Sequence, residues 1–138
     1  APLIKSYYRN IAGAIIVFDV TCRRSFERLK FWIKELKQNS ENSHPIPKLL
    51  IGNKIDSPIR EVSFIEANEF ALCNNLMYRE TSAKNAKNTT QALHDLCNKV
   101  AENINENKGI IINRPLDLKG ESNKDRSYYY NCYKCVIS

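Results

Sequence analysis

The stretch Lys48-Leu49-Leu50-Ile51-Gly52-Asn53-Lys54-Ile55-Asp56 decides the fold. An apolar run that is preceded by prolines and followed by a polar turn predicts a buried strand ending in a loop. The loop carries an amide, a lysine and a carboxylate at Asn53, Lys54 and Asp56. One carboxylate at the end of a strand suits a ligand edge with two adjacent N–H donors, which guanine has and adenine lacks. We therefore expect Asp56 to bind that edge, Asn53 the other side of the ring, and the Lys54 stem its face.

A second stretch makes this interpretation specific, because an isolated N-K-x-D also fits a polar turn with an exposed carboxylate. Glu80-Thr81-Ser82-Ala83-Lys84 follows another short strand, predicted at residues 76–79. The two stretches, separated by one strand-helix unit, resemble the base-recognition motifs of Ras-superfamily GTPases. The resemblance implies the fold of the P-loop NTPases. It also implies contacts between a guanine oxygen and the backbone N–H groups around Ser82, Ala83 and Lys84.

Other stretches resemble the Rab GTPases in particular. Residues 7–10 read Tyr-Tyr-Arg-Asn, and residues 14–21 form an apolar run ending in Asp-Val-Thr. A Rab protein is a GTP/GDP-binding switch in vesicle traffic on the cytoplasmic face of intracellular membranes such as endoplasmic reticulum, Golgi or vesicles. The resemblance therefore implies GTP or GDP with Mg²⁺ as cofactors. The implied partners are effectors, exchange and activating factors, and the prenylation escort machinery.

The remaining pattern alternates strands with amphipathic helices. Residues 14–21 predict a strand that is buried on both faces. Residues 24–39 predict a helix with Thr21 as its cap. Ser63 and Glu66 predict a capping box at the start of the next helix. A third helix is predicted from residue 88 or 89, with an apolar stripe at Leu93, Leu96, Cys97, Val100 and Ile104. Alternation of this kind predicts an α/β fold with a parallel sheet and crossover helices, and ligands at the carboxyl ends of the strands.

Composition narrows the class of partner. The chain has 138 residues, 43% of them hydrophobic and 26% charged, which are globular values, and a net charge of +6. The basic residues are scattered, so an anionic membrane surface fits better than nucleic acid. Five cysteines do not suggest a disulfide framework. Cys22, Cys73 and Cys97 are expected to be small core residues, and no ligand spacing predicts a metal site.

The chain is expected to divide into a domain at residues 1–107 and a flexible hypervariable tail at residues 108–138. An apolar patch at residues 110–118 resembles a segment held by the escort machinery, or it packs on the domain. The final four residues, from Cys135 to Ser138, form a C-a-a-X prenylation box. A farnesyl or a geranylgeranyl group is compatible with it. Because one lipid chain anchors only marginally, Cys132 is a candidate second lipidation site.

By the resemblance, residues 1–107 are the C-terminal part of a GTPase domain whose N-terminal strands are missing. The sequence contains no G-x-x-x-x-G-K-[ST] phosphate loop, no switch threonine for magnesium and no D-x-x-G-Q stretch. We expect no hydrolysis and no stable nucleotide binding from the isolated chain, and an open edge on the strand at residues 14–20. Two alternatives remain. The chain is a truncated, nucleotide-free isoform that acts as a protein-binding module, or an unrelated α/β domain.

Overall fold

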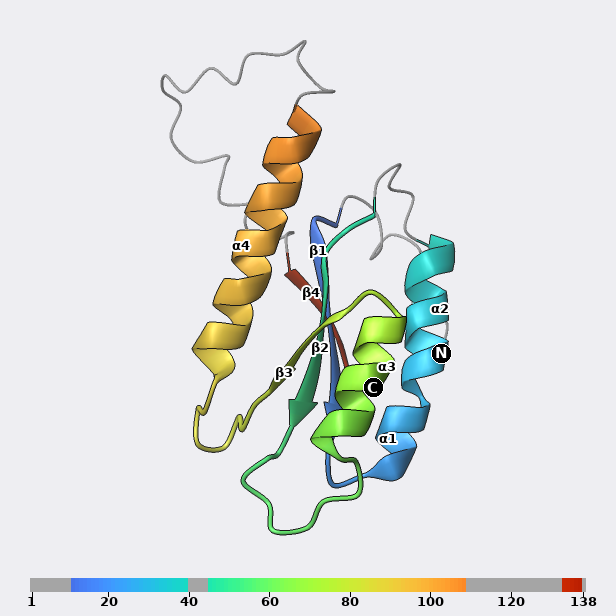
Figure 1. The fold of residues 1–138 in the computed structure, drawn as a ribbon, viewed down its shortest axis with the longest axis vertical. Coiled ribbons are helices and arrows are strands. Elements are labelled where there is room, and N and C mark those ends of the chain that lie inside the picture. Colours follow the sequence, from blue (N-terminus) through green and yellow to red (C-terminus); the bar gives the residue numbers. More distant parts are fainter. Residues whose placement is uncertain (1–10, 40–44, 109–132, 138) are drawn as a thin grey trace.

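The computed structural model describes residues 11–39, 45–108 and 133–137. Four strands form one parallel sheet with the order β3-β2-β1-β4, and helices connect successive strands from β1 to β3 (Figure 1). The predicted α/β class with crossover helices is confirmed. The elements in chain order are β1 (Gly13–Asp19), α1 (Arg23–Glu27), α2 (Leu29–Asn39), β2 (Lys48–Asn53), α3 (Phe64–Cys73), β3 (Met77–Glu80), α4 (Thr89–Lys108) and β4 (Tyr133–Ile137).

The sheet is the middle of three layers, with α1, α2 and α3 on one face and α4 on the other (Figure 1). Because successive side chains of a strand point to opposite faces, β1 supplies both cores. Ala14, Ile16 and Phe18 pack towards α1, α2 and α3, whereas Ile15 packs towards α4. The continuous apolar sequence of β1 is explained by this burial on both faces.

The helix predicted over residues 24–39 is divided into α1 and α2 at Arg28. The N-cap of α1 is Cys22, not the predicted Thr21, and the Cys22 side chain makes no capping hydrogen bond. The N–H of Arg23, the first residue of α1, donates to Glu61 Oε2 instead. Thr21 is engaged elsewhere, because its N–H and its hydroxyl both donate to Asp19 Oδ1, at 2.9 and 2.6 Å. Thr21 thus forms short-range hydrogen bonds to Asp19, at the end of β1, instead of capping the helix.

The other two helices begin where the sequence predicts them. Ser63 caps α3 and accepts a hydrogen bond from the Glu66 N–H at 3.1 Å. In α4 the buried positions are Ala92, Leu96 and Val100, whereas the predicted core residues Leu93 and Ile104 are 46% and 44% exposed. Among the described residues, α4 is buried against the sheet only at positions four residues apart, so its buried stripe is narrower than predicted.

The predicted open edge of β1 is wrong for the described part of the chain. β4 pairs with β1 in parallel, in a register that runs from Gly13 opposite Tyr133 to Val17 opposite Ile137. Residues 133–137 therefore form a strand, in which Cys135 lies opposite Ile15. Pairing satisfies backbone groups that an uncovered edge would leave to solvent or to another chain.

Two further expectations are checked by burial and hydropathy. The three cysteines predicted to lie in the core do not all do so, since Cys73 is exposed and Cys22 and Cys97 are partly buried. None of the helices in the described ranges combines the length and apolar character needed to cross a bilayer.

Candidate functional site

The two loops predicted to bind a base lie side by side at the carboxyl ends of β2 and β3. These strands are parallel neighbours, so the residues that follow them leave the sheet at the same edge. Two backbone hydrogen bonds continue the pairing beyond the strands: Thr81 N–H donates to Gly52 O at 2.9 Å, and Ile55 N–H donates to Thr81 O at 3.3 Å. The parallel sheet thus brings together the Asn53–Asp56 loop and the Thr81–Lys84 loop.

Asn53 holds the second loop in place. Its Oδ1 accepts hydrogen bonds from the Ala83 N–H at 3.0 Å and from the Thr81 hydroxyl at 3.2 Å. Its backbone carbonyl accepts from the Val20 N–H at 3.0 Å, which ties the loop to the end of β1. One amide side chain therefore fixes the positions of both recognition loops.

Asp56 is oriented by Ser82. The Ser82 hydroxyl, which is fully buried, donates to Asp56 Oδ1 at 2.5 Å. This hydrogen bond holds the pKa of Asp56 below its ordinary value, and the charges of Lys84 and Lys54 act in the same direction. Ser82 Oγ in turn accepts from the Asn85 N–H at 3.2 Å. The result is an exposed, ionised carboxylate with a fixed orientation, as required for an acceptor of two N–H donors.

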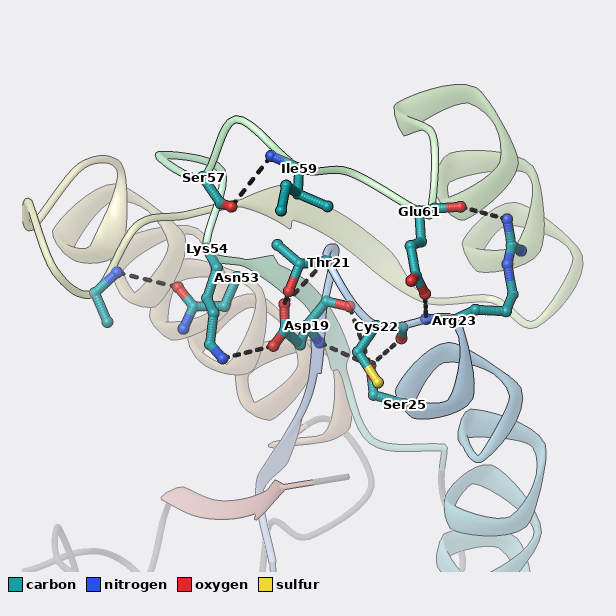
Figure 2. Close-up of polar contacts among 11 residues, drawn as sticks. Asp19, Thr21, Cys22, Arg23, Ser25, Asn53, Lys54, Ser57, Ile59 and Glu61 are labelled. Atoms are coloured by element: carbon teal, nitrogen blue, oxygen red, sulfur yellow. Dashed lines mark hydrogen bonds and ion pairs between the residues drawn. The ribbon is translucent and has the colours of Figure 1, made fainter.

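Lys54 turns back across the sheet edge towards β1. Its φ of 69° lies in the left-handed region that non-glycine residues seldom adopt, and its Nζ lies 2.6 Å from Asp19 Oδ2 (Figure 2). Burial raises the pKa of Asp19, but hydrogen bonds from Lys54 and Thr21 outweigh it, so the net pKa is below the ordinary value. The ion pair lays the lysine side chain between the ends of β1 and β2, where its stem forms an apolar surface.

The cluster presents three kinds of group at the edge of the sheet. It offers one ionised carboxylate, backbone N–H groups in the Ser82–Lys84 turn and an extended lysine stem. In the part of the chain that the structure describes, no three His, Cys, Asp or Glu side chains gather in a way that would hold a metal ion.

Comparison with known proteins identifies the family. The family model for the Ras family matches residues 1–102. This chain belongs to the Ras family. Among similar proteins, the Ras-related protein Rab-2B of Dictyostelium discoideum is 39% identical over 112 residues, which are 80% of this chain and 54% of that protein. The human Ras-related protein Rab-30 is 35% identical over 131 residues, which are 94% of this chain and 63% of that protein.

The relatives named Rab agree with the Rab resemblance noted from the sequence, which is thereby confirmed. The chain of this Ras-family protein spans between about half and two thirds of the length of these curated relatives. The similarity to these relatives therefore does not by itself establish the activity or the partners of the whole protein.

The structure places the six predicted nucleotide-binding residues of this Ras-family protein in one cluster. Of the two predicted lipidation sites, Cys135 is in β4, and Cys132 is outside the described residues. Asp19 and Thr81 also belong to the cluster, because they bind Lys54 and Asn53, although neither was predicted as a site residue. A usable signal existed for Asp19, because it is the acidic residue that ends an otherwise apolar strand.

Proposed function

We propose that this protein is a Rab-type GTP/GDP-binding switch in membrane traffic and that the cluster around Asp56 recognises the guanine base. The observation that supports this most strongly is the orientation of the ionised Asp56 carboxylate by Ser82 from the neighbouring loop. Guanine offers N1–H and an exocyclic amine to that carboxylate. A purine without the amine would leave it partly unpaired, which in comparable hydrogen-bonding sites costs up to about ten-thousand-fold in binding.

The other residues of the cluster complete the proposed base site. The Lys54 stem would cover one face of the ring, in the position that its ion pair with Asp19 gives it. The guanine oxygen would accept from backbone N–H groups around Ala83 and Lys84. Because the Ala83 N–H already donates to Asn53 Oδ1, that bond must be shared or lengthened when the base is bound.

Phosphate and Mg²⁺ binding are not explained by the residues of this chain. Members of this family use a glycine-rich loop for the phosphates, and the sequence has no G-x-x-x-x-G-K-[ST] stretch. The described residues also lack a cluster of metal ligands. We therefore derive no step of GTP hydrolysis from these residues, and base recognition is the part of the function proposed for them.

The decisive experiment exchanges the hydrogen-bonding character of Asp56 in the full-length natural protein. Asp56→Asn should weaken GDP binding by at least roughly a hundredfold and favour xanthosine diphosphate, because xanthine has a carbonyl that can accept from the new amide. Asp95→Asn is the matched control, since Asp95 is a carboxylate of α4 that pairs with Arg79. Bound nucleotide is identified by chromatography and its affinity by calorimetry. An Asp56→Asn protein with unchanged preference for guanine would contradict the proposal.

We also propose that Cys135, with Cys132 as a second site, anchors the protein to the cytoplasmic face of a membrane. The C-a-a-X box at the end of the sequence supports this, as does the net charge of +6. Effectors, exchange and activating factors and the escort machinery would then be its partners. Mass spectrometry of membrane-bound protein should find a prenyl group on Cys135. Finding both cysteines unmodified there would contradict the anchor.

A further inference from the structure

A polar cluster connects the segment that follows Asp56 to the end of β3. Arg60 forms an ion pair with Glu80 through both carboxylate oxygens, and Tyr78 donates its hydroxyl proton to Glu80 Oε1 at 2.8 Å. The Arg60 Nε–H donates to Val62 O at 2.7 Å. Three side chains and one backbone carbonyl therefore form a single hydrogen-bonded unit.

The members of this unit flank the two loops that carry the proposed recognition residues, because Arg60 follows the first loop and Tyr78 and Glu80 belong to β3, which precedes the second. Arg60 lies four residues after Asp56, in the segment that connects β2 to α3. Glu80 is the last residue of β3 and directly precedes Thr81. The Glu80 carbonyl also accepts from Asn88 Nδ2 at 3.0 Å, so the same residue holds the far end of the second loop. Movement of either loop would therefore strain the bonds of Glu80.

The side chains of the Arg60–Glu80 pair are less exposed than those of the other ion pairs among the described residues. The side chains of Arg60 and Glu80 are 34% and 16% exposed, and Tyr78 is 6% exposed. Burial, with the hydrogen bond to Glu80, raises the pKa of Tyr78. An enclosed bidentate pair with a third partner has a fixed geometry, whereas exposed pairs contribute little.

We propose that Arg60 and Glu80 are a positioning pair that sets the separation of the Asp56 carboxylate from the Thr81–Lys84 loop and thereby the selectivity for guanine. This inference rests on the function proposed above. Neither residue touches the base. They act through Asp56 and Ser82, whose hydrogen bond requires the two loops to stay in register.

The first test measures loop motion in the full-length natural protein without reference to nucleotide. Arg60→Met keeps the length of the side chain and removes its charge. It should speed hydrogen exchange at the Ile55 and Ala83 amides, which bond across the two loops, by roughly tenfold. Arg79→Met is the matched control, because it breaks the ion pair of Arg79 with Asp95 on α4 and should leave those amides unchanged. Unchanged exchange in a folded Arg60→Met protein would overturn the proposal.

The second test measures the ratio of GDP to inosine diphosphate affinity, since hypoxanthine lacks the amine that Asp56 would recognise. Arg60→Met should lower this ratio roughly tenfold, and Arg60→Lys should restore part of it. A loss of stability alone would weaken both nucleotides equally, and that outcome would overturn the positioning role. If Arg60→Met does not fold, Glu80→Gln removes the charge of the other partner and should lower the same affinity ratio.

The two tests separate this inference from the function on which it rests. If the unaltered protein does not prefer GDP to inosine diphosphate, the proposed guanine recognition fails. The exchange measurements then still decide whether Arg60 and Glu80 hold the loops together.

Discussion

At the scale of single residues, Gly52 shows how little space separates β2 from its neighbours just before the recognition loop. A Cβ atom added there would lie 2.6 Å from Tyr78 Oη, 3.0 Å from Val20 Cγ1 and 3.1 Å from Phe18 Cζ. Phe18 and Val20 belong to the tightly packed core, and Tyr78 is fixed by Glu80. None of the three can withdraw without disturbing the packing beneath the site.

We predict that Gly52→Ala destabilises the protein by about 1–3 kcal/mol through overpacking. The free energy of unfolding is measured by urea denaturation. Gly13→Ala is the comparison, because the one atom that its Cβ would approach closer than 3.0 Å is Cγ2 of the Val100 side chain, on α4. We expect a smaller loss there. An equal or larger loss at Gly13 would show that crowding around Tyr78 is not the cause.

Lys54 offers a second prediction at this scale, through the titration of Asp19. The pKa of Asp19 is below its ordinary value, so its ion pair stabilises the fold fully above about pH 3.9 and is lost as the pH falls through the lower folded pKa. In Lys54→Met the burial of Asp19 and its hydrogen bonds from Thr21 remain, but the lysine is gone, so the pKa of Asp19 should rise. Carbon-13 NMR of the Asp19 carboxyl group measures this shift. Lys99→Met, which removes a pair with Glu102 on α4, should leave it unchanged.

At the scale of elements, α3 depends on how its first turn is completed. Ser63 accepts from the Glu66 N–H, as a capping box requires. The Glu66 side chain, however, forms an ion pair with Arg23 of α1, and Arg23 also donates to Glu61 O at 2.6 Å. The start of α3 is thus attached to α1 by charge, while Ser63 alone provides the side-chain cap.

We predict that Ser63→Ala lowers the free energy of unfolding by about 1 kcal/mol, because one N-terminal amide of α3 loses its acceptor. Urea denaturation measures the change. Ser57→Ala is the control, since the Ser57 hydroxyl accepts a longer bond of 3.3 Å from Ile59 N–H in an exposed loop. A loss at Ser57 as large as that at Ser63 would count against helix capping as the reason.

At the scale of the whole molecule, the sheet is completed by residues from the far end of the sequence. β4 covers the edge of β1, so the most apolar strand of the sheet has a neighbour on each side, β2 and β4. Cys135, the proposed lipidation site, is one of the residues in this ladder.

We predict that removal of residues 133–138 makes the chain associate, because β1 then presents unpaired backbone groups on an apolar strand. Sedimentation velocity over a range of concentrations measures the association. The full chain with Cys135→Ser is the control for disulfide-linked aggregates. It should sediment as the unaltered chain does. A shortened chain that sediments as a monomer with unchanged thermal stability would contradict a capping role for β4.

The sequence by itself determined the strands β1 and β2, the capped start of α3 and the two recognition loops, because each depends on local signals. Apolar runs, a Ser-x-x-Glu pattern and two short motifs need no knowledge of distant residues. Only the tertiary structure decided which polar partner each site residue has. Asp19 with Lys54, Ser82 with Asp56 and Arg60 with Glu80 are separated in sequence and meet because parallel strands end at one edge. The position of β4 could not be predicted either. A distant segment pairs with whichever edge of the sheet is uncovered, and no local sequence pattern indicates which edge that is.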